Sequence, residues 1–186
     1  MAREKKAQPT WKDVKAVIQS FDRDGLQGLV RDLYAASKDN QSFLHARLNL
    51  GTDQLEPFKK VISRWISPDI MRNQPISVSK SKKAIADYRK AIGRPEGLAE
   101  LSVFYCEEAF DFLDSCGLED ESYFLALIRM YDQATEFVRQ LPSTDRAFYA
   151  GRLNKLRSRA SHVGWGVQDE LDDIWFQAGL DDGEHQ

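Results

Sequence analysis

Residues 75–113 read PISVSKSKKAIADYRKAIGRPEGLAELSVFYCEEAFDFL and change electrical sign at Pro95. Lys and Arg crowd the part before this proline, whereas Glu and Asp fill the part after it. Both parts carry apolar residues at helical spacing, which predicts two consecutive amphipathic helices. Ser79 can cap the first helix over residues 80–92, and Gly93 can end it. Pro95 suits the first turn of the second helix.

The first of these helices is expected to turn its cations toward water. At about 100° per residue, Lys82 and Arg89 fall on the arc opposite Tyr88. The basic face of this stretch consists of Lys80, Lys82, Lys83, Arg89, Lys90 and Arg94. It can contact an acidic protein surface or the phosphates of a nucleic acid, or it can be an ordinary solvated face. No aromatic residue suited to base stacking accompanies it, because Tyr88 lies on the apolar side.

The second helix carries the opposite charge. Leu101 and Tyr105 belong to an apolar stripe that Phe104 and Phe110 widen on its flanks. The acidic face opposite this stripe consists of Glu100, Glu107, Asp111 and Asp114. The wide stripe predicts that this helix is the central element of the core. The acidic face is expected to point outward, and over residues 100–136 it could meet a basic partner or a second copy of the chain.

The rest of the chain carries the same helical signal nearly from end to end. Near the N-terminus the apolar residues at this spacing are Val14, Val17, Ile18, Phe21, Leu26, Leu29, Val30, Leu33 and Tyr34. No strand-like alternation of useful length occurs. The sequence therefore predicts an all-α fold of about eight or nine helices, arranged as an antiparallel bundle or a short stack of helical hairpins.

One helical domain is expected over residues 10–179, with flexible tails at 1–9 and 180–186. This domain has a basic part, 10–94, and an acidic part, 95–179. The first 94 residues hold 19 Lys and Arg against 10 Asp and Glu, and the remaining residues hold 7 against 19. These counts give +9 and −12, which sum to the net charge of −3. Such a split favours a charged partner, charge-directed self-association, or two halves held together by their own fields.

Composition excludes several classes of protein. No apolar run approaches the roughly 20 residues that a membrane-spanning helix needs. The N-terminus has positive charge without the apolar segment of a secretory signal. Cys106 and Cys116, if both are on one helix, lie about 15 Å apart, which is too far for a disulfide. We therefore expect a cytoplasmic protein without membrane partners, and no motif calls for a cofactor.

Two strings in the chain resemble a family of bacterial proteins catalogued as a domain of unknown function. They are KDNQSFLHARL at 38–48 and PISVSKSKKAIADYRKAIGRPEGLAELSVFYCEEAFDF at 75–112. The similarity extends over about residues 24–180 and includes GWGVQDELDDI at 164–174. The resemblance implies a bacterial cytoplasmic protein and an all-helical domain. It implies no activity, so no catalytic residue is carried over from it.

One pair of residues matches a catalytic pattern. Arg157, followed by four residues and His162, has the Arg and His spacing of a class of helical ribonucleases, in which His is a base and Arg stabilises phosphate charge. With 14 Arg among the 186 residues of the chain, one match to this spacing is what chance alone supplies. The sequence therefore assigns no catalytic residue and keeps Arg157 and His162 as candidates.

The C-terminal region contains two further candidates. Asp169, Asp172 and Asp173 fall on one helical face and could hold Mg²⁺, although acidic residues are also typical of a first helical turn. Trp165, between two glycines, could anchor a partner or fold onto the next helix as a hydrophobic staple. The sequence assigns no metal ligands.

These patterns favour a non-enzymatic interaction module over an enzyme. The expected partner is a protein, or a second copy, recognised through the segregated basic and acidic faces. The alternatives are nucleic-acid binding through residues 80–94 and, third, the ribonuclease of Arg157 and His162.

Overall fold

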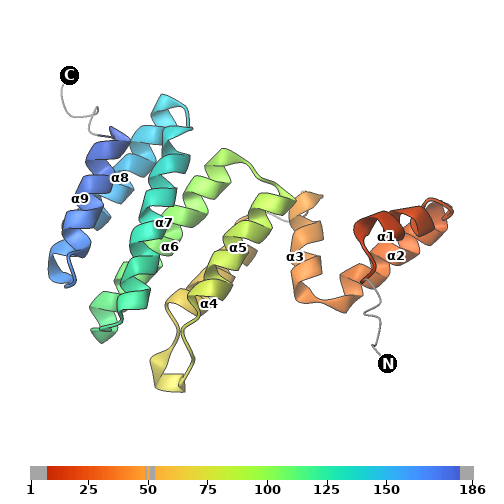
Figure 1. Cartoon of the computed structure of the whole chain (residues 1–186), viewed down its shortest axis with the longest axis horizontal. Helices are drawn as coiled ribbons and strands as arrows, with labels where there is room; N and C mark the ends of the chain where they lie inside the picture. Colours follow the sequence, from red (N-terminus) through yellow and green to blue (C-terminus); the bar gives the residue numbers. More distant parts are fainter. Residues whose placement is uncertain (1–7, 49, 51–52, 181–186) are drawn as a thin grey trace, which may run out of the picture. The chain divides into compact units, whose positions relative to one another are not determined.

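The fold is all-α, as predicted. The computed structural model describes residues 8–48, 50 and 53–180, and within these ranges it contains helices and no strand (Figure 1). The helices are α1 (Trp11–Ile18), α2 (Arg23–Ala36), α3 (Lys38–Arg47), α4 (Glu56–Ile66), η1 (Ile70–Arg72), α5 (Val78–Ala91), α6 (Pro95–Cys116), α7 (Glu121–Arg139), α8 (Ser143–Arg159), η2 (Ala160–His162) and α9 (Val167–Ala178). No helix among the described residues has the length and apolar character needed to cross a membrane.

Packing divides the chain into two compact units. The N-terminal unit comprises residues 1–44 and the C-terminal unit residues 45–186. The expectation of one domain over residues 10–179 stays a prediction. The predicted tails lie largely outside the described residues, although Leu180 is buried in the core of the C-terminal unit.

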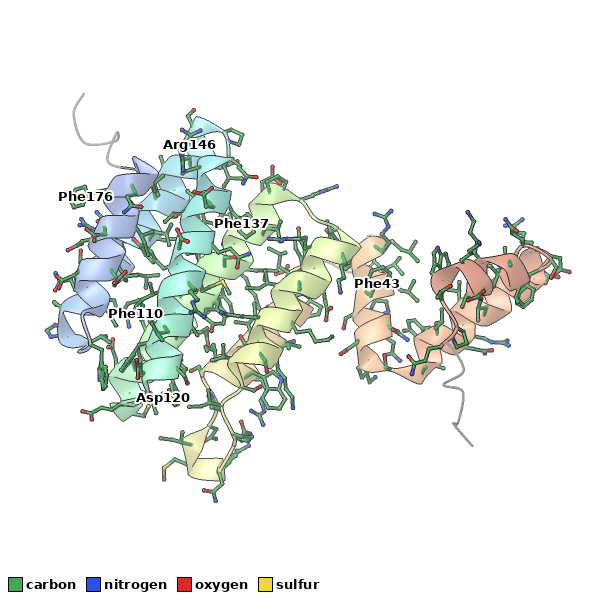
Figure 2. All side chains as sticks on the ribbon, in the orientation of Figure 1. Phe43, Phe110, Asp120, Phe137, Arg146 and Phe176 are labelled. Carbon is green, nitrogen blue, oxygen red and sulfur yellow. The ribbon has the colours of Figure 1, made fainter. Side chains whose placement is uncertain are left out.

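Helix α6 is the centre of the C-terminal unit, which confirms the prediction from its wide apolar stripe. It packs against α4 and α5 on one side and against α7 and α8 on the other, while α9 packs on α7 and α8. Successive helices from α4 to α9 run in alternating directions (Figure 1). Phe110 of α6 has no exposed surface and lies in the interior between these helices (Figure 2). The antiparallel hairpin arrangement is therefore present in this unit.

The boundaries of α5 and α6 follow local chemistry. Pro95 is the first residue of α6, and Gly117 ends it with a positive φ of 60°. The prediction that Ser79 caps α5 is wrong by two residues, because Ser77 is the extended capping residue and Val78, not Lys80, begins the helix. Serines alternate along this stretch, and each of them is a good N-cap, so sequence alone does not choose between them.

Helices α5 and α6 approach closely at one glycine. A Cβ atom built on Gly97 would lie 1.9 Å from the hydroxyl oxygen of Tyr88. Tyr88 is buried and places its ring edge-on to Phe58 of α4, with centroids 5.4 Å apart. Only glycine fits at position 97, because any side chain there would occupy the volume of the tyrosine ring.

The N-terminal unit has capped helices but no buried core. Both the amide and the hydroxyl of Thr10 donate to the carboxylate of Asp13, each at 2.7 Å. The carboxylate of Asp22 caps α2 by accepting from the amide of Gly25. The side-chain amide of Asn40 donates to the carbonyl of Leu33 near the end of α2. None of the residues 8–44 is buried.

Candidate interaction surfaces

Two helices of the same chain cover the acidic face of α6. The guanidinium of Arg152 on α8 donates to both carboxylate oxygens of Glu107, at 2.8 and 2.6 Å, and also to Glu100. Lys59 on α4 pairs with the other oxygen of Glu100 at 2.5 Å. Arg159, two turns after Arg152, contacts the remaining two members of the face, Asp111 at 2.7 Å and Asp114 at 2.6 Å.

The expectation that the acidic face points outward is therefore wrong for Glu100 and Glu107. The side chain of Glu100 is only 14% exposed, and that of Glu107 is 31% exposed. Helix α8 runs parallel to α6, because each is antiparallel to α7. Arg152 and Arg159, seven residues apart, consequently meet acidic residues that are also seven residues apart, Glu107 and Asp114. This shared spacing was the signal in the sequence that could have revealed the pairing.

The cations around Glu100 control its ionisation. Burial alone would raise the pKa of this carboxyl, but hydrogen bonds and charge from Arg152 and Lys59 outweigh it and hold the pKa below the ordinary glutamate value. The Tyr149 hydroxyl beside this group has its pKa raised to about 12, first by burial and then by the Glu100 carboxylate. The cluster is ionised at neutral pH and joins α4, α6 and α8.

The basic face of α5 remains mostly at the surface. All of its members are exposed except Lys82, which is half-buried. Lys83 pairs with Asp87 one turn later, at 2.5 Å, and stays 57% exposed. Within the described part of the chain, neither Lys90 nor Arg94 forms an ion pair with a carboxylate. The basic face is thus neutralised far less than the acidic face.

Aromatic rings hold two members of the basic face in place. The Lys80 ammonium lies 3.8 Å from the centroid of the Trp65 ring. The Arg89 guanidinium lies 5.2 Å from the ring centroid of Phe137 on α7, a residue labelled in Figure 2. Cation–π contacts of this kind fix the charged groups without neutralising them.

Arg129 of α7 extends the basic face onto a second helix. Helices α5 and α7 both run antiparallel to α6, so they run parallel to each other. Arg89 meets Phe137, and two turns earlier on each helix Lys82 and Arg129 reach the same level. The pKa of the Lys82 ammonium is lowered, first by partial burial and then by the charge of Arg129. The sequence did not reveal Arg129, because only tertiary packing brings these helices together.

Arg157 and Asp172, which the sequence assigned to two different hypotheses, are bonded to each other. The Arg157 guanidinium donates to Asp172 of α9 at 2.7 Å and to the side chain of Asn154 at 3.0 and 2.8 Å. It also lies over the ring of Trp175. His162 is exposed in η2. Arg157 therefore ties α8 to α9, which is a structural role.

The acidic residues of α9 form no metal site in the structure. Asp172 is engaged by Arg157, and both Asp169 and Asp173 are exposed. Over residues 8–48, 50 and 53–180, no group of three or more His, Cys, Asp or Glu side chains could hold a metal ion.

Trp165 is an exposed aromatic residue on a left-handed backbone. Its φ is 63°, and the next residue, Gly166, has a φ of 69°. Trp165 is 67% exposed, and the centroid of its ring lies 6.5 Å from the ring centroid of Phe124 on α7. A bulky residue rarely adopts this φ, so the conformation stores some backbone strain.

The N-terminal unit exposes seven of the nine apolar residues that the sequence expected to point inward, together with Trp11, while Ile18 and Leu29 are partly buried. This N-terminal apolar face consists of Trp11, Val14, Val17, Phe21, Leu26, Val30, Leu33 and Tyr34, which are 38–69% exposed. An open groove of about 550 Å³ runs along α2, where Leu26 and Val30 line it together with Arg23 and Gln27. The inward orientation is confirmed for the apolar stripe of α6 and is wrong for α1 and α2.

Comparison of the chain with protein-family models, with curated proteins and with solved structures found no match. The resemblance to a bacterial family of unknown function therefore stays a prediction.

Proposed function

We propose that this protein is a non-enzymatic interaction module that binds an acidic protein surface through the basic face of α5 and the adjoining Arg129. The observation that carries the proposal is the unequal use of charge in the C-terminal unit. Lys59, Arg152 and Arg159 neutralise the acidic face of α6, whereas the basic face stays exposed. The family resemblance supports a bacterial, cytoplasmic setting.

The positions of the cations support protein recognition. Trp65 and Phe137 restrain Lys80 and Arg89 before any partner arrives, so less side-chain entropy is lost on binding. Lys82 and Arg129 repel each other, and an acidic group placed between them would relieve that repulsion. A surface of this kind raises association rates and loses affinity as salt increases.

A charge-reversal experiment tests the proposal. Full-length protein is used to capture partners from its host, and the affinity of each purified partner is measured against salt concentration. We expect an acidic protein whose binding the double variant Arg89→Glu, Lys90→Glu abolishes. The control, Lys60→Glu, Lys155→Glu, makes the same change of charge at exposed sites elsewhere and should bind normally. Equal binding by both variants would refute the role of the basic face.

Nucleic-acid binding is the second candidate, and it rests on the same Lys82–Arg129 neighbourhood as the first. Two adjacent cations on parallel helices suit a phosphate oxygen, and each phosphate contact releases condensed counterions. A mobility-shift assay at low salt with single- and double-stranded DNA and RNA separates the candidates. A shift that the Arg89→Glu, Lys90→Glu variant abolishes, with affinity falling linearly in log salt, would favour nucleic acid. No shift with any of the four probes would eliminate it.

A further inference from the structure

Helices α1 and α2 of the N-terminal unit are strongly amphipathic, yet they bury none of their apolar residues. On α1, Trp11, Val14 and Val17 fall within an arc of about 120°, and on α2 the stripe that includes Leu26 and Val30 fills about 140°. All five residues are 41–69% exposed. Sequence periodicity of this strength normally marks a face that packs against another surface.

These helices are too short to be stable without such packing. Helix α1 has 8 residues and α2 has 14. Isolated helices below about 12–15 residues are marginal in water, so most of their stability must come from an apolar face that is covered. The caps at Thr10 and Asp22 set where the helices begin, but each contributes only about 1 kcal/mol.

The charge of the N-terminal unit indicates what kind of surface covers it. Residues 8–44, which carry the N-terminal apolar face, hold five basic side chains and five acidic ones, so the net charge of this segment is zero; the whole unit of residues 1–44 holds eight and six and carries +2. The balance over residues 8–44 gives the helices that bear the face no electrostatic preference for an acidic or a basic partner. The apolar faces of two copies therefore meet without net repulsion between these helices.

The extent of the apolar face is also what a dimer requires. At their observed exposure, its eight side chains leave roughly 400–700 Å² in water per copy. A stable interface buries about 800 Å² per partner, of which about 65% is apolar in homodimers. One N-terminal apolar face therefore supplies the apolar area of one half of a homodimer interface.

We propose that two copies of this chain associate through the N-terminal apolar face, with the α1 and α2 hairpins of both copies forming a four-helix bundle. In such an arrangement the same patch is used on both copies, and the groove along α2 receives apolar side chains from the second copy. This inference is independent of the basic face and of its partner.

Light scattering and analytical ultracentrifugation of the full-length chain over a concentration series test the proposal. We expect a particle of twice the 21.3 kDa chain mass. The dissociation constant of this dimer should not increase with salt concentration, because the contact is apolar. The double variant Leu26→Gln, Val30→Gln should raise the dissociation constant of the dimer at least about a hundredfold, because both copies lose apolar burial.

A matched control lies on the polar side of α2. The double variant Asp24→Gln, Arg31→Gln leaves the net charge unchanged and should dimerise like the parent chain. Far-ultraviolet circular dichroism checks that both variants keep their helices. A parent chain that stays monomeric at millimolar concentration would overturn the proposal, because no second copy would then cover the N-terminal apolar face. A dimer that survives the Leu26 and Val30 changes would overturn it too, because the interface would then lie elsewhere.

Discussion

Arg152 and Glu107 form a bidentate ion pair, in which the arginine Nε lies 2.8 Å from Oε1 and an Nη lies 2.6 Å from Oε2 of the carboxylate. The remaining Nη of the same group reaches Glu100, which also binds Lys59. Alternating acidic and basic groups thus run from α4 across α6 to α8. A largely buried network of this kind adds little net stability compared with apolar packing, but it penalises any other register of the helices.

Removing Arg152 should destabilise the fold markedly. The variant Arg152→Ala leaves Glu107 without its cation and Glu100 with Lys59 as its one remaining cation, and both carboxylates lie in a partly dehydrated site. Loss of one member of a buried pair costs about 3–5 kcal/mol, and the 19% exposure of Arg152 places the expected loss near the lower bound, about 3 kcal/mol. Urea unfolding followed by circular dichroism measures it. Lys155→Ala, on the exposed side of α8, should change stability by less than about 0.5 kcal/mol, and equal losses in the two variants would contradict this assignment.

The ionisation of Glu100 predicts a loss of stability in acid. Its pKa in the folded chain lies below the ordinary value of 4.5, which also applies to the unfolded chain. The stabilisation is therefore fully present above pH 4.5 and disappears as pH falls through the lower folded value. Unfolding free energy measured between pH 7 and pH 3 should fall more steeply in the parent chain than in Glu100→Gln. Parallel curves would show that Glu100 has no part in the acid sensitivity.

Apolar periodicity predicted the helical class and the central place of α6, because both depend on spacing within one segment. The fate of charged residues depends instead on which helix covers them. Glu100 occupies the polar arc of its own helix and is nevertheless 14% exposed, since α8 brings Arg152 over that arc. Arg129 joins the basic face only because α5 and α7 both pack on α6, which brings the charge of Arg129 close enough to act on Lys82. Neither relationship can be obtained by analysing a single helix.

In the N-terminal unit, apolar residues predicted to be buried are exposed instead. Val14 and Leu26 lie on apolar stripes that resemble those of α7, yet they are exposed. A stripe indicates that a helix face needs a cover, but it does not say whether that cover is in the same chain. The same rule therefore located the core of α6 and gave the wrong environment for α1 and α2.

The two cysteines should differ sharply in reactivity. Cys106 has no exposed surface, and burial raises the pKa of its thiol far above the ordinary value, whereas Cys116 is partly exposed. Because the thiolate is the reactive form, a disulfide reagent should modify one thiol per folded chain and two after denaturation. Cys116→Ser should remove the reaction of the folded protein. Two reactive thiols in the folded chain would contradict the burial of Cys106.

Two glycine-to-alanine changes within α6 and α8 should have opposite effects on stability. At Gly97 the added methyl would lie 1.9 Å from the Tyr88 hydroxyl, and this buried ring has no room to move. The resulting overpacking costs about 1–3 kcal/mol and outweighs the gain in helix propensity of about 1 kcal/mol. At Gly151, which is exposed, no atom beyond its chain neighbours and the local backbone of its own helix lies within 4 Å of the added methyl. Only the propensity gain remains there, so Gly151→Ala should stabilise the protein by about 0.5–1 kcal/mol.

Thermal unfolding of both variants measures these effects, and a double variant tests the cause at Gly97. Tyr88→Phe removes the atom nearest to the added methyl, so combining it with Gly97→Ala should cost less than the sum of the two single changes. Additive losses would show that the methyl does not press on the tyrosine. A stabilising Gly97→Ala would mean that α5 and α6 are further apart than the Tyr88 contact requires. The basic face of α5 would then also lie further from Arg129.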